Sequence, residues 1–152
     1  MCTFQPKNYH SLTDYQPPTW AEELKSIPEK RIQLAQLPTP IHKWTLNNVP
    51  AHVELFIKRD DLTGSTLSGN KVRKLEFILA SAVSRGCKSV ITCGSMQSNH
   101  CRATAVAARE LGLGSHLLLR STDPIMPSFN NLGNLLPSML CGSKIYLIPK
   151  NS

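Results

Sequence analysis

The sequence has few aromatic residues, few acidic residues and no long apolar run. Phe, Trp and Tyr make up 6% of its 152 residues, and no run of Lys and Arg reaches the length of a heparin-binding or nuclear-localisation patch, so the features of a nucleic-acid-binding protein are missing. No apolar stretch approaches the roughly 20 residues that a membrane-spanning helix needs, which excludes an integral membrane protein. The length suffices for one modest globular domain.

The shortage of acidic residues leaves the chain basic. It holds 17 Lys and Arg against 10 Asp and Glu, a formal net charge of +7. This balance favours an anionic partner such as a phosphorylated ligand, but it equally fits a surface of dispersed, hydrated cations. The net charge alone leaves both interpretations open.

The five cysteines lack the spacing of a disulfide framework or a redox motif. Their number is odd, no C-x-x-C occurs and no signal peptide precedes them, which indicates reduced thiols in an intracellular protein. Only Cys93, His100 and Cys101 resemble a metal site, and Cys93 stands where a buried small residue belongs, so we predict no metal. Asp14 and Glu22 argue against a transit peptide, although the first dozen residues carry no acid. We therefore expect the cytoplasm, with the mitochondrion as the alternative.

From residue 53 onward, short apolar strands alternate with helical patterns. This order predicts a parallel sheet covered on both faces, a three-layer α/β/α fold. The expected strands are 53–58, 89–92, 116–119 and 144–148, and the expected helices are 70–84, 99–111 and 129–141. Pro137 should kink or break the last helix. Because the chain stops directly after a strand, we expect it to be incomplete.

The first junction that could carry chemistry joins a loop to the helix at 70–84. Gly69 allows a tight turn, and Lys71, Arg73 and Lys74 follow at the start of the helix. A helix N-terminus attracts anions, so cations gathered there are unfavourable in isolation, and an anionic ligand would offset this cost. The alternative is that the three side chains simply point into water.

The second junction joins the strand at 89–92 to the helix at 99–111. Four consecutive polar residues stand where backbone N–H groups are free: Gln97, Ser98, Asn99 and His100. Ligands of open α/β sheets bind outside the carboxyl ends of the strands, where this loop lies. The alternative is helix capping by Ser98 or Asn99, and both interpretations can hold together. The chain lacks G-x-G-x-x-G and the P-loop pattern, so dinucleotide and triphosphate binding have no fingerprint here.

Read together, four motifs resemble one known family. They are Pro38–Ile41, Lys58–Leu62, Gly69–Phe77 and Gln97–Ala105. They are similar to D-cysteine desulfhydrase and, more broadly, to the family that also holds 1-aminocyclopropane-1-carboxylate deaminase. These are pyridoxal-phosphate enzymes of the tryptophan-synthase-β fold, and the similarity runs from about residue 37 to the C-terminus. His100 and Cys101 resemble the desulfhydrase branch.

The resemblance implies roles for individual residues. Lys71 would carry pyridoxal phosphate covalently and act as the base at the substrate Cα, helped by neighbouring cations, and Ser98 is the second expected catalytic residue. Lys74 would lie near the cofactor phosphate, and Asn99 would hydrogen-bond the phenolic oxygen. The amino-acid substrate would be held through its carboxylate by the start of the second helix: Gln97, Ser98, Asn99 and His100.

The implied reaction is the β-elimination of D-cysteine to pyruvate, ammonia and hydrogen sulfide. 1-Aminocyclopropane-1-carboxylate or another D-amino acid is the alternative substrate, and a non-catalytic short isoform is a further possibility. Relatives would form a homodimer at full length. By the resemblance, residues 1–72 belong to a large domain and 73–152 form most of a small one. The second half of the family's chain, which holds the phosphate-binding loop, is missing here. The isolated chain should therefore be weakly active or inactive.

One departure from the family concerns the loop after the strand at 89–92. Relatives commonly have two glycines there, whereas this chain has Gly94 and Ser95. The Ser95 side chain is expected to crowd a loop built for close approach.

Overall fold

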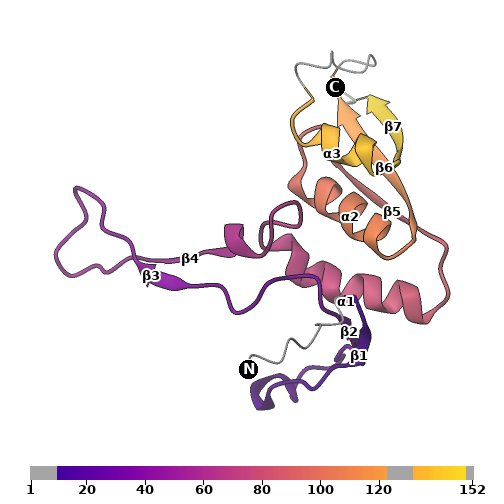
Figure 1. The fold of residues 1–152 in the computed structure, drawn as a ribbon. Coiled ribbons are helices and arrows are strands. Elements are labelled where there is room, and N and C mark those ends of the chain that lie inside the picture. The colour runs from indigo at the N-terminus through magenta and orange to yellow at the C-terminus, as the bar shows by residue number, and fades with distance from the viewer. Residues whose placement is uncertain (1–9, 123–131, 150–152) are drawn as a thin grey trace, which may run out of the picture.

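The computed structural model describes residues 10–122 and 132–149. Most of the elements are short, and the helices and the sheet gather in the second half of the chain (Figure 1). In chain order they are β1 (Leu12–Asp14), the 3-10 helix η1 (Thr19–Ala21), β2 (Lys30–Ile32), β3 (Ile41–Lys43), β4 (Phe56–Lys58), the 3-10 helix η2 (Asp60–Leu62), α1 (Lys71–Ser84), β5 (Ser89–Ser95), α2 (Asn99–Glu110), β6 (Gly114–Ser121), α3 (Leu135–Leu140) and β7 (Lys144–Pro149).

The main sheet is parallel and has the order β5-β6-β7. Each strand follows a helix or precedes one, as the alternating pattern predicted, and β5 and β6 extend beyond the predicted ranges. Within the sheet, Cys93 of β5 pairs with Leu118 of β6, and Leu118 pairs with Tyr146 of β7. The carboxyl ends of β5 and β6 therefore lie at one edge, next to the start of α2.

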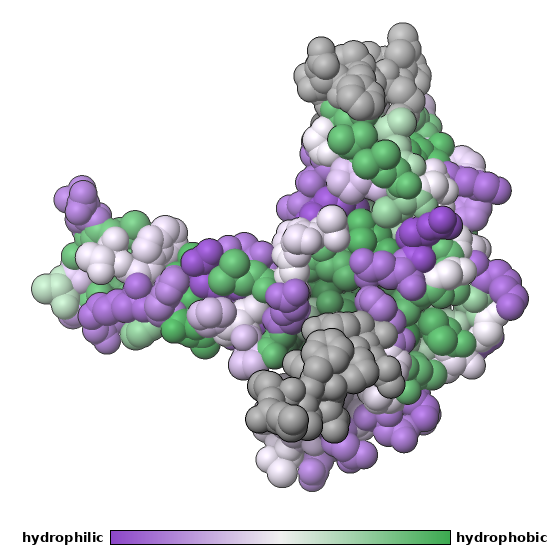
Figure 2. Space-filling model, in the orientation of Figure 1, coloured by the Kyte–Doolittle hydropathy of each residue, from purple (hydrophilic) through white to green (hydrophobic). Residues whose placement is uncertain are grey.

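The prediction that the strand at 53–58 joins this sheet is wrong. Only residues 56–58 of this range form a strand, β4, which pairs antiparallel with β3 in a separate ribbon, with Ile41 opposite Lys58. The ribbon projects from the body of the molecule (Figure 1), and apolar residues lie on its surface (Figure 2). Ile41 is 63% exposed and Phe56 is 61% exposed. Alternation and β-branching identify a strand, but they do not say which strand it pairs with.

Helices α2 and α3 pack against the same face of the sheet. Cys101 and Ala105 of α2 and Leu135 of α3 pack under Leu117 and Leu119 of β6. On the opposite face Ile91 is 72% exposed and Tyr146 is 44% exposed. The described residues thus supply two of the three layers predicted for this fold.

Pro137 neither kinks nor breaks a helix, and the prediction that it does so is wrong. The helix predicted at 129–141 begins only at Leu135 in the described part of the chain, and Pro137 is its third residue. The first four N–H groups of a helix have no partner within it, so a residue without an N–H costs little there. Residues 129–131 of the predicted helix lie outside the described residues.

Helix α1 is held to the N-terminal segment by a buried carboxylate. Glu76 is 1% exposed. One carboxylate oxygen accepts hydrogen bonds from the backbone N–H groups of Leu34 (3.0 Å) and Ala35 (2.9 Å), and the other accepts one from Arg31 Nε (2.9 Å). The surrounding apolar cluster joins Ile32 and Leu34 to α1 and α2. Since this core crosses residue 72, the division into domains at that point stays a prediction.

In the part of the chain that the structure describes, no helix combines the length and apolar character needed to cross a bilayer.

Replacing Glu76 with Ala should lower the free energy of unfolding by about 2–4 kcal/mol, because two buried N–H groups and an arginine lose their acceptor. The matched control is Glu54→Ala, which removes an exposed carboxylate paired with Lys43 and should cost less than about 1 kcal/mol. Urea unfolding at pH 7 measures both. Equal effects of the two substitutions would contradict the structural role of Glu76.

Candidate functional site

The two junctions singled out in the sequence meet at one cavity of about 490 Å³. This volume lies within the roughly 300–1,000 Å³ of small-molecule sites. The wall is formed by the end of β4 and the segment after it, the loop before α1 and the first turn of α2: Lys58, Asp60, Asp61, Ser68, Gly69, Asn70, Asn99 and Arg102. Residues about 30 positions apart in the sequence therefore face the same space.

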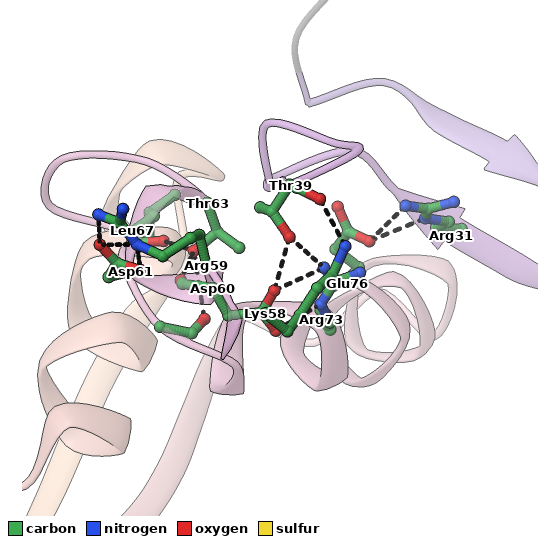
Figure 3. A network of polar contacts seen from close by, with 11 residues as sticks. Arg31, Thr39, Lys58, Arg59, Asp60, Asp61, Thr63, Leu67, Arg73 and Glu76 are labelled. Atoms are coloured by element: carbon green, nitrogen blue, oxygen red, sulfur yellow. Dashed lines mark hydrogen bonds and ion pairs between the residues drawn. The ribbon is translucent and has the colours of Figure 1, made fainter. Parts of the chain in front are cut away.

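Arg73 forms an ion pair with Asp60, which neither interpretation of the sequence predicted. It is bound to Asp60 through two hydrogen bonds, of 2.8 Å from Nε and 2.7 Å from a terminal nitrogen (Figure 3). Thr39 Oγ1 adds a bond of 2.8 Å to the same carboxylate. Hydrogen bonds from Arg73 lower the pKa of Asp60 to about 2. The ion pair explains a cation at the start of a helix without any ligand.

Lys71 and Lys74 both lie in the first turn of α1. Lys71 is half-buried, whereas Lys74 is exposed. Gly69 has a φ of +100°, a conformation that favours glycine and turns the chain sharply into the helix. Asn70 precedes Lys71 without capping the helix through its side chain, so N–H groups at this helix end remain for a ligand.

Arg102 fixes the loop that leads to Lys71. From α2 it donates to the backbone oxygen of Thr66 (2.8 Å) and to the backbone oxygen and hydroxyl of Ser68 (both 3.2 Å). Its Nε is buried and has no hydrogen-bond partner among the residues that the structure describes. The sequence reasoning missed this residue. Its position three residues after Asn99, on the same face of the helix, is the signal that could have identified it.

The start of α2 confirms capping by Ser98 and corrects the expectation for Ser95. Ser98 Oγ accepts a hydrogen bond of 3.2 Å from the backbone N–H of Cys101. A Cβ on Gly94 would lie 2.8 Å from both Ser98 Oγ and Cys101 Sγ. The position that tolerates no side chain is thus Gly94. Ser95 is exposed and does not crowd the loop.

His100 lies half-buried near the two lysines of α1. Burial and then the positive charges of Lys71 and Lys74 lower its pKa below the usual value, so the imidazole is neutral at pH 7. Its Nδ1 is buried and has no hydrogen-bond partner within 10–122 and 132–149. A neutral, unpartnered imidazole nitrogen can bind a ligand group as donor or as acceptor.

Gln97 and Asn99 contact the segment before α3. The Gln97 side chain bonds to Leu132 and Asn134, and Asn99 Oδ1 accepts a bond from Asn134. Asn99 also lines the cavity. The substrate contact predicted for Gln97 stays a prediction, and the geometry gives it a structural role as well.

Burial raises the pKa of Cys101, which keeps this cysteine a thiol, while Cys93 is exposed. Among the described residues, no group of three or more His, Cys, Asp or Glu is arranged to hold a metal ion.

Residues 32–151 match the model of the pyridoxal-phosphate dependent enzymes. This range includes both junctions and every residue that lines the cavity.

Several curated proteins are similar to the chain. The bifunctional D-cysteine desulfhydrase/1-aminocyclopropane-1-carboxylate deaminase, mitochondrial, of Arabidopsis thaliana is 53% identical over 90% of this chain and 34% of its own length. A D-cysteine desulfhydrase of Salmonella paratyphi A is 45% identical over 60% of this chain and 28% of its own length. The chain thus spans about a third of the length of the curated relatives it matches.

A solved structure supports the same relationship. The crystal structure of an ACC deaminase homologue matches with a TM-score of 0.68 and 35% identity, covering 90% of this chain and 40% of the other. An O-ureido-L-serine synthase structure matches with a TM-score of 0.54 and 18% identity, which indicates a shared fold alone.

The Asp60 pair makes stability depend on pH. The pKa of Asp60 is depressed, so its stabilisation is complete above about pH 5 and is lost as the pH falls toward 2. Asp60→Asn should therefore lower the free energy of unfolding by about 1–2 kcal/mol at pH 7, and the difference from the wild type should shrink below pH 4. Urea unfolding between pH 3 and pH 7 measures it.

Asp61→Asn is the matched control, because Asp61 pairs with Arg59 at the surface and should show a smaller effect. A difference between Asp60→Asn and the wild type that stays constant down to pH 3 would rule out this origin of the stability.

Proposed function

This chain belongs to the family of pyridoxal-phosphate dependent enzymes, and from that membership and the geometry of the cavity we propose that it serves the β-elimination of D-cysteine. The observation that carries the proposal is the convergence of Lys71's loop and the polar start of α2 on one cavity. The Arabidopsis relative, whose name includes D-cysteine desulfhydrase, matches over 90% of this chain. Because the chain spans about a third of their length, activity of the isolated chain is part of the proposal.

The residues around the cavity fit pyridoxal phosphate, which carries an anionic phosphate, a phenolic oxygen and an aldehyde. The two acids in the wall are already neutralised, Asp60 by Arg73 and Asp61 by Arg59. The groups left to face a ligand are therefore mainly donors. Arg102 lines the same wall, and its buried Nε has no hydrogen-bond partner among the described residues.

We assign the cofactor contacts to three residues. Lys71, half-buried at the start of α1, would carry the cofactor through its amine, and Lys74 would add positive charge near the phosphate. Asn99 would donate to the phenolic oxygen. When bound, pyridoxal phosphate supplies an electron sink for the negative charge that develops at the substrate Cα.

The remaining residues act on the substrate. Lys71, once released from the cofactor, would accept the Cα proton. Ser98, Asn99 and neutral His100, with Gln97 beside them, would hold the carboxylate at the N-terminus of α2, where the helix dipole favours a negative charge. With water, D-cysteine then yields pyruvate, ammonia and hydrogen sulfide, which balances all atoms.

A second candidate substrate is 1-aminocyclopropane-1-carboxylate. The printed names of relatives support it, since the Arabidopsis protein is named for both activities. The described residues contain no feature that separates the two substrates. The same name places that relative in the mitochondrion, so we propose either the cytoplasm or the mitochondrion for this chain, and a homodimer for its full-length form.

Trapping tests the cofactor site. With pyridoxal phosphate and borohydride, the chain should form a stoichiometric adduct on Lys71, found by mass spectrometry of its peptides. Lys71→Arg should abolish this adduct, and the control Lys88→Arg, at an exposed lysine before β5, should leave it unchanged. Label scattered over many lysines, or an adduct that survives in Lys71→Arg, would contradict the assignment.

Product analysis tests the reaction. With pyridoxal phosphate, D-cysteine should release sulfide and ammonia in equal amounts at a low rate, and Lys71→Ala should reduce both to background. 1-Aminocyclopropane-1-carboxylate contains no sulfur, so ammonia without sulfide from that substrate would favour the second candidate. A specific adduct with no product from either substrate would identify a chain that binds the cofactor without catalysis.

A further inference from the structure

Three side-chain amides and one backbone segment form a polar clamp beside the cavity. The clamp consists of Gln97, Asn99, Asn134 and the backbone of Leu132. Gln97 Nε2 donates to the Leu132 oxygen (3.2 Å), and the Asn134 backbone N–H donates to Gln97 Oε1 (2.8 Å). Asn134 Nδ2 donates to both the Gln97 backbone oxygen and Asn99 Oδ1, each at 2.9 Å.

Backbone groups determine which way each amide in the clamp is turned. A backbone oxygen can only accept, so the Gln97 oxygen requires the nitrogen of the Asn134 side chain. That nitrogen can only donate, so Asn99 must present its oxygen to Asn134. Asn99 Nδ2 is consequently the end of this amide that remains for other partners, and it has none among the described residues.

Gly133 makes this arrangement possible. Its φ is +46°, and a Cβ at this position would lie 2.3 Å from Gln97 Oε1. A side chain there would displace the Gln97 amide from its bond to Asn134. The close approach of the two segments thus depends on glycine at one position.

We propose that Asn134 is a positioning residue, which holds the Asn99 amide with its Nδ2 donor free for the cavity. This inference rests on the proposed function, in which that donor meets the phenolic oxygen of the cofactor. Asn134 touches neither cofactor nor substrate in this role. It sets the donor direction of a residue that does.

The proposal predicts effects of different size for two substitutions of Asn134. Asn134→Ala removes the partner of Asn99 Oδ1 and leaves the amide free to rotate. Asn134→Asp keeps the shape but replaces the donor by an acceptor, so Asn99 turns its nitrogen toward Asp and its oxygen toward the cavity. An oxygen facing a phenolic oxygen cannot donate to it, and Asn134→Asp should therefore be the more damaging change.

The first experiment needs no cofactor. In nuclear magnetic resonance of the ¹⁵N-labelled chain, the Asn99 side-chain amide should be ordered in the wild type and mobile in Asn134→Ala. In Asn134→Asp it should stay ordered, with one Nδ2 proton shifted downfield by the carboxylate. The control is Asn47→Asp, the same change in the exposed turn between β3 and β4, which should leave Asn99 unaltered. If neither substitution of Asn134 changed the resonance of the Asn99 side-chain amide, the proposal would be overturned.

The second experiment titrates pyridoxal phosphate and measures the adduct trapped on Lys71. Asn134→Asp should weaken apparent binding by about tenfold, the effect of one hydrogen bond to a charged oxygen. In an Asn99→Ala background the same substitution should not weaken binding further, because the side-chain amide that Asn134 orients is absent. Equal losses in both backgrounds would show that Asn134 acts on stability only, and would refute the positioning role.

The two experiments separate the two proposals. No Lys71 adduct in the wild type would overturn the proposed function of this chain, while the resonance of Asn99 still decides whether Asn134 orients it. A normal adduct together with an unaffected Asn99 amide would leave the proposed function standing and remove the positioning role.

Discussion

The position of Lys71 depends on the ion pair between Arg73 and Asp60. Arg73 lies two residues after Lys71 in the same turn of α1, and its two bonds to Asp60 fix the direction in which that turn leaves the loop. Asp60 also holds the other side of the loop, since its backbone oxygen accepts from Gly69 N–H at 2.8 Å. One residue thus constrains both the entry to the helix and its first turn. A lysine that must meet a ligand in one geometry needs this support, because its own side chain is flexible.

Contacts that are distant in sequence hold α1 in place on two further sides. Glu76 binds the segment at 31–35, some 40 residues upstream of it, and Arg102 binds the loop at 66–68, some 35 residues upstream of Arg102. Each of these charged groups is partly or fully removed from water and has more than one partner, so the loss of a single partner leaves a charge with reduced compensation. The site therefore takes its shape from charged side chains that have no direct role in the proposed chemistry. These side chains form the framework on which Lys71 and Asn99 are placed.

The local parts of this arrangement could be predicted from the sequence. The helix at 71–84 follows from apolar residues at helical spacing, and the cap at Ser98 follows from a polar residue before such a pattern. The partners of Arg73 and Asn99 could not be predicted, because they lie 13 and 35 residues away and no periodicity links them. The prediction for Pro137 was wrong because the start of its helix was placed incorrectly. The apolar pattern suggested a helix start several residues early, and a proline that is harmless in the first turn then seemed to lie inside the helix.

The pairing of charges around the cavity decides which ligands it can favour. Asp60 and Asp61 would repel an anion if they were free, but each is bound to an arginine, so their negative charge is largely cancelled. Asn99 Nδ2 and Arg102 Nε have no acceptor among the described residues, and the amine of Lys71 and the two helix N-termini add positive charge. What remains at the cavity is a set of donors that the chain does not satisfy internally. A ligand with several anionic oxygens satisfies such a set, whereas a neutral ligand would leave donors buried without partners. The net charge of +7 is thus a poor guide to the site, and the distribution of partners among its residues is the informative property.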